Sequence, residues 1–439
     1  MAATAPNFQF IADALNGTGG FADGSYLVPY PRESADKIAA RRGLAWYANA
    51  LRPACQRFAG YLMKKPAFRD LRHPALAAFS DSCNWQDDSL DIFWSRFMID
   101  AKARGSMLLL VDLPSPEQRA SGERTIPYLV TIAPESLKSY RLNGRGQLAE
   151  VVILDRVQDK NGAWVNVERA YTQTGWKFTG GETGEGTHTL GACPVLVFTE
   201  SGLFPALGEF ATIADLSRRL YNLRSELDEI LRAQTFSLLT LKVPEAQFPL
   251  SDLKDVAQAI GTSNLLQTFQ DGAEFIAPPS GPAETYIQVI AQVEALIRQA
   301  ALIVDIPASG QRESGVALQL RFQALNASLV HFARRMEDFE RKVWWLVQRW
   351  LGIENQDVIV TWGKDFSIAD LATEMEIAQN MDALNAPPEY RRAKLKQLVQ
   401  LDLATLPGDE LSLILKAVDD MALETPAAET PSNIASVAP

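Results

Sequence analysis

The sequence feature that most constrains the fold is a long apolar periodicity in the last third of the chain. Apolar residues recur there at alternating steps of four and three: Leu318, Phe322, Leu325, Leu329, Phe332, Met336, Phe339, Val343, Leu346 and Trp350. This spacing places them on one face of a single helix. No proline or glycine interrupts the run before Gly352, which is suited to ending a helix. At 1.5 Å per residue, such a helix is about 50 Å long.

Two interpretations of this stripe are open. The first is ordinary packing in the core of one chain. The second is packing between neighbouring copies in a ring, which the unusual length of the stripe favours. A second amphipathic helix, about 284–304, precedes it, and the loop 308–315 joins the two. That loop is either a plain connection or a mobile finger with Gln311, Arg312 and Glu313 at its tip.

Composition limits the classes of function. The chain has 439 residues, of which 47% are hydrophobic and 22% charged, so it is globular and long enough for two to four structural units. Its formal net charge of −11 argues against tight, static binding of nucleic acid. An acidic surface remains compatible with DNA that slides past. We expect no signal peptide at the start of the chain, and no apolar run in the sequence is long enough to cross a membrane.

Chemical motifs are missing. The three cysteines and three histidines show no disulfide or metal-ligand spacing. Neither a phosphate-binding GxxxxGK[ST] loop nor a GxSxG elbow occurs. The GxGxxA match at 144–149 lies between two strand-like runs, which indicates a hairpin turn. The pairs Asp87-Asp88 and Asp419-Asp420 are better explained as solvated faces than as catalytic carboxylates. We therefore expect no catalytic, cofactor-binding or metal-binding residues and no cofactor.

The order of elements predicts an α+β protein. Residues 1–25 are expected to form a loose arm, followed by a helical stretch from 35 to 61 that Pro53 breaks or kinks. A helix at 89–104, a buried strand at 106–113 and several strands between 126 and 199 complete the first unit. A helix at 207–233 and a helix at 284–304 bracket a small insert with three strands and a helix at 251–260. Three helices, about 368–384, 388–404 and 409–423, follow the long helix.

A series of short motifs in this order resembles the portal proteins of tailed bacteriophages, the ring through which DNA enters and leaves the capsid. The motifs that carry the resemblance are Tyr30-Pro31-Arg32-Glu33 with Arg41 and Asn49, Gly60–Pro66, Arg104-Gly105-Ser106, Leu110–Pro114, Pro194-Val195, Asp215-Leu216, Tyr221-Asn222, Ser225–Leu231 and Ser314–Leu318. Together they span about Tyr26 to Leu351. Each motif is weak alone, and the colinear series carries the resemblance.

The resemblance implies a division of the chain into wing, stem, clip and crown. The expected segments are an N-terminal arm (1–25), the wing (26–206), a stem helix (207–234), the clip (235–280), a second stem helix (281–305), a tunnel loop (306–314), a long wing helix and strand (315–363), the crown (364–424) and a disordered tail (425–439).

The same resemblance implies a function without catalysis. A dodecameric ring at the capsid vertex of the virion would conduct double-stranded DNA during packaging and ejection. Its partners would be the terminase large subunit, a head-tail adaptor and the major capsid or scaffolding protein, with no membrane involved and synthesis in the host bacterial cytoplasm. The channel residues would be Gln311, Arg312, Glu313 and Ser314 in the tunnel loop, with Arg224 and Arg298 in the stem.

Two other functions are weighed against this one. An α+β enzyme of the hydrolase or transferase type fits the fold class, but no nucleophile and base occur together in a recognisable motif. A coiled-coil scaffold unrelated to phages fits the long helix, but the strands between 126 and 199 argue against it.

Overall fold

The computed structural model divides the chain into two units, residues 1–366 and 367–439, each of which is described by itself. The structure describes residues 6–64, 66–159, 161–181, 183–235, 238–242, 265–268, 274–276, 281–303, 315–353, 358–364, 366, 387–403 and 408–421; side chains are not described for 315–321 or for the strands between 238 and 276. Helices and mainly antiparallel sheets make up these parts, so the expected α+β class is confirmed.

The long helix is present as α10, Gly315–Leu351, 37 residues in length. Its apolar stripe from Leu325 to Leu346 is buried in the main core of the same chain. The ring of Phe332 lies 5.5 Å from Phe58, and that of Phe339 lies 5.6 Å from Phe97. Core packing is therefore the correct interpretation of these residues, and the expectation that they pack between copies is wrong. The helix is long because it crosses the whole core of its own unit.

Helix α5, Leu90–Arg104, packs on this core and leads into the central strand β2, Ser106–Asp112. The turn between them needs Gly105, whose φ is +77°. A Cβ added there would lie 1.9 Å from the backbone nitrogen of Gly208. The close approach of these two segments places the start of the next long helix against the end of α5.

Two antiparallel sheets face each other across a second core, which contains Leu108, Val151 and Tyr171. The three-stranded sheet has the order β3-β2-β9, with β3 at Tyr128–Ile132 and β9 at Val195–Thr199. The five-stranded sheet is a meander of β4 (Leu137–Leu142), β5 (Leu148–Gln158), β6 (Trp164–Thr172), β7 (Gly175–Gly180) and β8 (Gly184–Thr187). The GxGxxA match forms the turn between β4 and β5, as expected. Helix α6 (Pro116–Ala120) lies between β2 and β3, and the 3-10 helix η2 (Pro134–Ser136) lies between β3 and β4.

The N-terminal residues differ from the expectation. Residues 8–16 form helix α1 (Phe8–Asn16), and a short 3-10 turn follows as η1 (Gly19–Phe21). The rings of Phe21 and Tyr47 stack at 4.0 Å. The expectation of a loose arm is wrong because Phe10, Ile11 and Leu15 are buried in the main core.

The predicted helical stretch 35–61 is two helices, α2 (Ala35–Leu44) and α3 (Leu51–Met63). The break precedes Pro53 instead of falling on it. Pro53 sits in the first turn of α3, where its missing N–H removes no helical hydrogen bond. Three short elements close this side of the unit: β1 (Phe68–Asp70), α4 (Pro74–Asp81) and β13 (Ile359–Thr361), in which β1 and β13 pair.

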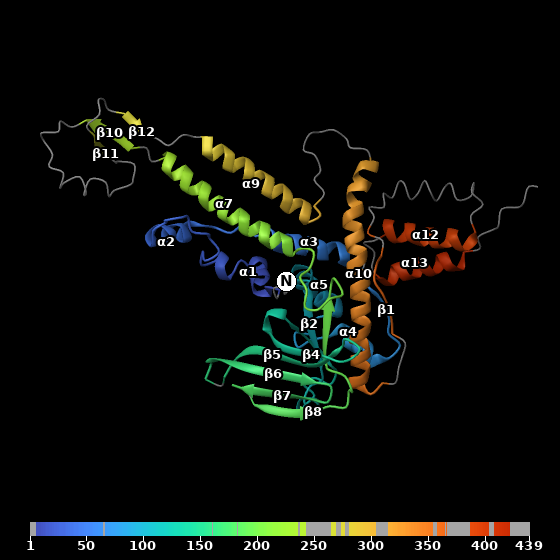
Figure 1. The fold of residues 1–439 in the computed structure, drawn as a ribbon. Helices are drawn as coiled ribbons and strands as arrows, with labels where there is room; N and C mark the ends of the chain where they lie inside the picture. Colours follow the sequence, from blue (N-terminus) through green and yellow to red (C-terminus); the bar gives the residue numbers. More distant parts are fainter. Residues whose placement is uncertain are drawn as a thin grey trace, which may run out of the picture. The chain divides into compact units, whose positions relative to one another are not determined.

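Two helices leave and re-enter this unit side by side (Figure 1): α7, Ala211–Thr235, and α9, Gly281–Ala300. The three predicted strands between them are confirmed as β10 (Leu238–Lys242), β11 (Leu265–Thr268) and β12 (Glu274–Ile276). Strand β10 lies in the middle, parallel to β11 and antiparallel to β12. The predicted helix 251–260 lies outside the described residues.

In the second unit, α12 (Pro388–Asp402) packs on α13 (Gly408–Asp420). An ion pair of 2.6 Å joins Lys396 to Asp419. These two helices match the predicted ones, whereas the predicted helix 368–384 lies outside the described residues. Across the described part of the chain, no helix is both long and apolar enough to span a membrane.

Replacing Phe332 by Ala tests the placement of the long helix. Phe332 is fully buried, so Phe332→Ala is expected to lower the free energy of unfolding of the chain by about 3–5 kcal/mol. Lys342→Ala, on the exposed side of α10, is the matched control and should change it by less than about 0.5 kcal/mol. Denaturant unfolding at low protein concentration measures both. If Phe332→Ala weakened only the association of copies, the stripe would be an interface.

Candidate functional site

The described residues offer no metal centre and no reactive thiol. No cluster of three or more His, Cys, Asp and Glu side chains there is placed to hold a metal ion. Cys55, Cys83 and Cys193 are all buried. Burial raises the pKa of the Cys55 thiol to about 12, which keeps it protonated and unreactive.

The helix pair α7–α9 is the first candidate site, because the resemblance assigns channel residues to it. Two polar contacts fix its antiparallel pairing. The Arg224 guanidinium lies 2.8 Å from the Glu294 carboxylate, and the Tyr286 hydroxyl donates to Glu226 over 2.9 Å. Val293 and Ile297 of α9 are buried in the same core as the main body, so the pair is joined to that body by apolar packing.

A buried ion cluster anchors the start of α7. The ammonium group of Lys102, fully buried, lies 2.6 Å from both the Glu200 and the Glu209 carboxylates. It also donates to the Ser328 hydroxyl on α10 over 3.2 Å. The ring of Phe210 lies 4.5 Å from this ammonium. The cluster therefore holds α5, the residues before α7, and α10 in one fixed arrangement.

Two large apolar side chains on α9 remain exposed. Ile287 is 54% exposed and Leu296 is 49% exposed. At about 100° per residue, nine positions place them about 180° apart around the helix. They flank the buried stripe of Val293 and Ile297, one on each side. Single exposed apolar residues are common, but this symmetric placement gives α9 two apolar flanks that the described part of the chain does not cover.

The structure describes two of the six predicted channel residues, Arg224 and Arg298. Arg224 is engaged within the chain: besides its ion pair, its guanidinium lies over the ring of Trp46 at 4.7 Å. Arg298 lies on α9, half-buried, and also has an interaction partner. Gln311, Arg312, Glu313 and Ser314 lie outside the described residues. A role of these six residues in a channel stays a prediction.

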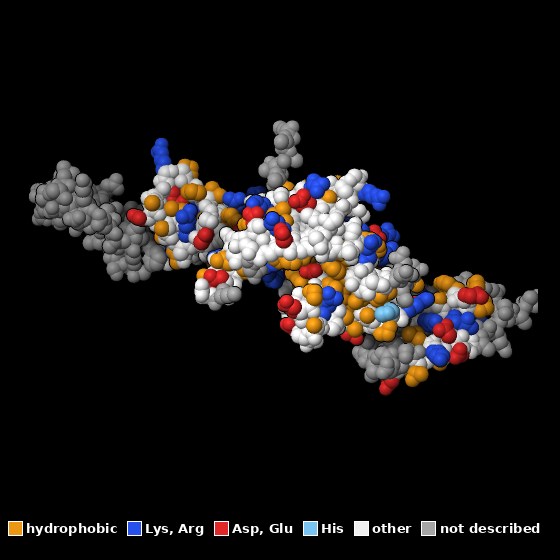
Figure 2. Space-filling model, turned by 90° about the horizontal axis from the view of Figure 1, so that it is seen from below, with side chains coloured by type: hydrophobic (Ala, Val, Ile, Leu, Met, Phe, Trp, Pro, Cys, Tyr) orange, Lys and Arg blue, Asp and Glu red, His pale blue; other side chains and the backbone are white. Residues whose placement is uncertain are grey.

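The charges on one face of the molecule are mixed (Figure 2). Lys and Arg side chains lie among Asp and Glu side chains on the coloured part of that face, without one continuous basic stripe. Such an arrangement suits weak, local contact with phosphates better than a fixed grip on DNA.

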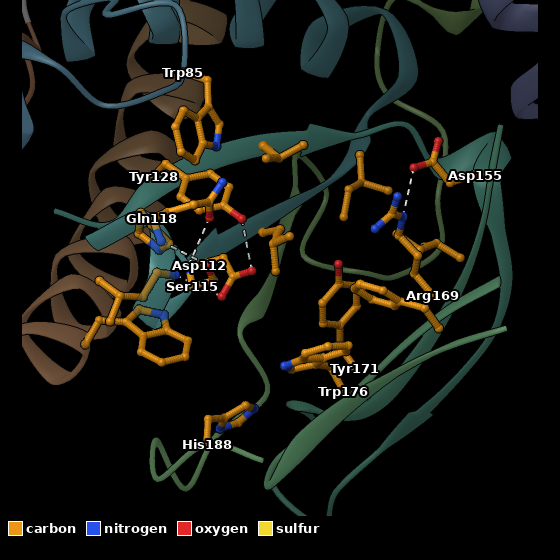
Figure 3. A pocket seen from close by; sticks show the side chains of 18 of the residues that line it. Trp85, Asp112, Ser115, Gln118, Tyr128, Asp155, Arg169, Tyr171, Trp176 and His188 are labelled. Carbon is orange, nitrogen blue, oxygen red and sulfur yellow. Dashed lines mark hydrogen bonds and ion pairs between the residues drawn. The ribbon is translucent and has the colours of Figure 1, made fainter. Parts of the chain in front are cut away.

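The second candidate site is a cavity of ≈ 970 Å³ between the two sheets of the body. One wall comes from β2, β3 and α6, and the opposite wall from β5, β6 and β7. Residues 187–189 and Trp350, at the end of α10, line it further. Figure 3 shows Asp112 and Tyr128 on one side of the cavity and Arg169 with Asp155 on the other.

Asp112 is the unusual group in this cavity. Its carboxylate accepts hydrogen bonds from the Leu113 backbone N–H at 2.8 Å and the Tyr128 hydroxyl at 3.2 Å. No Lys, Arg or His forms an ion pair with it among the described residues. Burial raises the pKa of Asp112 above its usual 3.8, and those two hydrogen bonds oppose the rise only in part. Keeping the Asp112 carboxylate charged in the cavity therefore lowers the stability of the folded chain.

The cavity was not predicted as a site from the sequence. Asp112 ends a continuous apolar strand and appears in the motif Leu110–Pro114, so a carboxylate directly after a buried strand was the available signal. Its partners Tyr128, Tyr171 and Trp350 come from distant segments, which only the fold brings together.

Asp112→Asn tests the electrostatics of the cavity. The pKa of Asp112 is raised in the folded chain, so its protonated form favours folding. That contribution is fully present below about pH 3.8, the unfolded value, and is lost as the pH rises through the raised pKa. The Asn side chain is neutral at every pH, so the variant keeps this contribution to folding stability at every pH. We expect Asp112→Asn to be more stable than the natural chain at neutral pH, with the difference shrinking in acid.

Thermal unfolding against pH measures this difference. The neighbouring Tyr128 and Tyr171 have raised pKa values and stay neutral throughout. Asp23→Asn is the control of opposite sign, because hydrogen bonds from Ser25 lower the pKa of Asp23 and favour its charged form. A loss of stability in Asp112→Asn at neutral pH would contradict the conclusion that the folded chain raises the pKa of Asp112.

Comparisons with known proteins give remote likenesses only. No protein-family model matches the chain, and no curated protein matches it. A chain of the virion of a native gene transfer agent particle is 12% identical, with a TM-score of 0.41, and the match covers 93% of this chain and 99% of that one. A chain from the neck of the native particle, computed with C12 symmetry, is 11% identical at a TM-score of 0.41, covering 91% and 98%.

An HK97 family phage portal protein from Corynebacterium diphtheriae is 10% identical, with a TM-score of 0.38, over 72% of this chain and 94% of that one. These likenesses are to a phage portal protein and to chains of virion and neck structures, and each has a TM-score below 0.5.

Proposed function

We propose that this chain is a portal subunit, a structural protein without catalysis that forms a ring at the capsid vertex of a virion. The observation that carries the proposal is the pair of uncovered apolar flanks on α9, at Ile287 and Leu296. In a closed ring, each copy contacts two neighbours through two different surfaces. A helix between two neighbours needs an apolar flank on each side, whereas a monomer or a two-fold dimer needs at most one.

The connectivity of the helix pair supports the same role. Helices α7 and α9 bracket the small sheet β11-β10-β12, as a stem brackets a clip in the family that the sequence resembles. In this proposal the wing is 26–206, the stem helices are 207–234 and 281–305, and the clip is 235–280. The tunnel loop 306–314 faces the DNA, 315–363 returns to the wing, and the crown is 364–424. The arm 1–25 and the tail 425–439 have no assigned role.

The charge of the chain fits a conduit for double-stranded DNA. A formal charge of −11 on each copy repels phosphates on average, so DNA moves through without binding tightly. The tunnel loop, with Gln311, Arg312, Glu313 and Ser314, makes the transient contacts. Arg224 and Arg298 keep the stem in shape and add local positive charge. The resemblance implies twelve copies in the ring.

The proposed partners follow from the same role. The clip docks the terminase large subunit and later the head-tail adaptor, and the wing meets the major capsid or scaffolding protein. The ring forms from chains made in the cytoplasm of the bacterial host.

Imaging of the purified protein separates the portal from an α+β hydrolase or transferase. Negative-stain electron microscopy and mass photometry should give rings with a central hole and a mass of about twelve copies. Compact single particles at every concentration would overturn the proposal.

Charge variants on α9 test the two-flank interface. Ile287→Glu and Leu296→Glu should each abolish rings and leave a folded, soluble chain, because burying an unpaired charge is costly. Gln288→Glu, at an exposed polar position of the same helix, should still form rings. Mass photometry of each variant measures the outcome.

Mixing the two variants sharpens this test. Each retains one intact flank, so an equimolar mixture should form heterodimers that cannot grow further. Rings from the mixture, or rings from either variant alone, would contradict the two-flank interface.

The tunnel-loop assignment is tested by Arg312→Glu. A reversed charge at the narrowest contact should reduce DNA packaging or retention several-fold while rings of normal mass still form. Lys342→Glu makes the same charge change at an exposed position of α10 and should leave both measurements unchanged. Equal packaging and retention in the two variants would remove Arg312 from the channel.

A further inference from the structure

We propose that the cavity between the two sheets is a binding site for an organic cation, a guanidinium or ammonium group carried on an apolar stem. The inference uses the residues of the cavity alone and does not depend on the ring. It assigns a ligand class to the Asp112 carboxylate, which has no basic partner among the described residues.

Charge complementarity is the first argument. A carboxylate that is partly withdrawn from water, as Asp112 is, is normally paired with a basic side chain or held by several hydrogen bonds. Asp112 has the Leu113 N–H and the Tyr128 hydroxyl as its donors, and no basic partner in the described part of the chain. A cation that enters the cavity supplies the missing charge and can donate to the carboxylate oxygens that remain open.

The two arginines that line the cavity do not form an ion pair with Asp112. The Arg169 guanidinium, on the opposite wall, donates to Asp155 over 3.0 Å and lies over the Phe178 ring at 4.6 Å. Arg119 on α6 is exposed and donates from Nε to the Pro114 carbonyl over 3.1 Å. Both are already engaged by groups of the chain other than Asp112.

Aromatic side chains form the second argument. Tyr128 and Trp85 lie with ring centroids 5.3 Å apart on the side of Asp112. Trp176 lies on the other wall, and Trp350 closes the end of the cavity with its ring 5.7 Å from His188. Aromatic faces attract cations, most strongly where water is excluded. A carboxylate among such rings suits a cation with an apolar stem better than a hydrated metal ion.

His188 adds an acceptor for the same ligand. Both its ring nitrogens are buried, and neither makes a hydrogen bond of full geometry among the described residues, although the Thr172 backbone lies near enough to oppose the lowering of its pKa. Burial lowers the pKa of His188, so the ring is neutral and one nitrogen accepts a hydrogen bond. A guanidinium or ammonium group that turns the His188 ring toward the cavity can donate to this nitrogen.

The size of the cavity leaves two sources for such a cation. A volume of ≈ 970 Å³ is at the upper end of the range for small-ligand pockets, about 300–1,000 Å³. The ligand is either a free diamine-like cation or an arginine or lysine side chain from another protein. The chemistry at Asp112 is the same for both.

Calorimetric titration of the full chain with agmatine tests the proposal, because agmatine has a guanidinium and an ammonium on a four-carbon stem. We expect saturable binding that is weaker by about tenfold or more in Asp112→Asn, since a charge-assisted hydrogen bond is lost. Trp176→Leu, which keeps an apolar wall, should also bind more weakly. Glu117→Gln removes an exposed charge beside the cavity on α6 and should bind like the natural chain.

A competition experiment identifies the source. A capped Gly-Arg-Gly peptide that displaces agmatine supports a side chain of another protein, and binding of agmatine without competition supports a free cation. The proposal is overturned if agmatine does not bind, or if Asp112→Asn, shown to be folded by circular dichroism, binds it equally well. Equal weakening in Glu117→Gln, or binding of inorganic phosphate in its place, would overturn it as well.

Discussion

The arrangement of the body depends on one buried cation, the ammonium group of Lys102. It is fully buried and lies within 2.6 Å of two carboxylates, Glu200 and Glu209. Removing the Lys102 ammonium would leave the Glu200 and Glu209 carboxylates next to each other without their cation, which is strongly destabilising. Because its partners lie after β9, before α7 and on α10, the cluster fixes the direction in which α7 leaves the body. The apolar flanks of α9 are positioned through this contact, since α9 packs on α7.

Much of the fold was predictable where local pattern and tertiary packing agree. The stripe from Leu318 to Trp350 predicted α10. The strands predicted between 126 and 199 include β5 and β6 of the meander and β3 and β9 of the three-stranded sheet, whereas β4, β7 and β8 were not predicted. Residues 1–25 were not predictable from local signals, because Gly17, Gly19 and Gly20 suggested a loose segment. Their structure depends on Phe10, Ile11 and Leu15 finding a core made by distant residues. The periodicity of the stripe predicts which face of the helix is buried. It does not predict whether that face packs within its own chain or against another chain.

Of the two candidate sites, the helix pair was predicted from the sequence and the cavity was not. The helix pair with its intervening strands was expected from the order of elements, while the contact of Arg224 with Glu294 was not. The aromatic cavity was missed because sequence distance separates Asp112 from Tyr171 and Trp350. Its most informative property, a carboxylate without a basic partner in the described residues, is a matter of burial and distance, and neither quantity can be obtained from a single sequence.

Cross-linking between copies tests the central claim, that α9 carries two different apolar flanks for two neighbours. The native cysteines are buried, so a chain with Ile287→Cys and Leu296→Cys has two reactive thiols. A bis-maleimide whose spacer matches the rise of nine helical residues, about 14 Å, should join this chain into a ladder of covalent oligomers that ends at the closed ring. Either single-cysteine chain should run as a single covalent chain on a denaturing gel after the same treatment. Efficient dimers from a single-cysteine chain, or no ladder from the double one, would contradict the account.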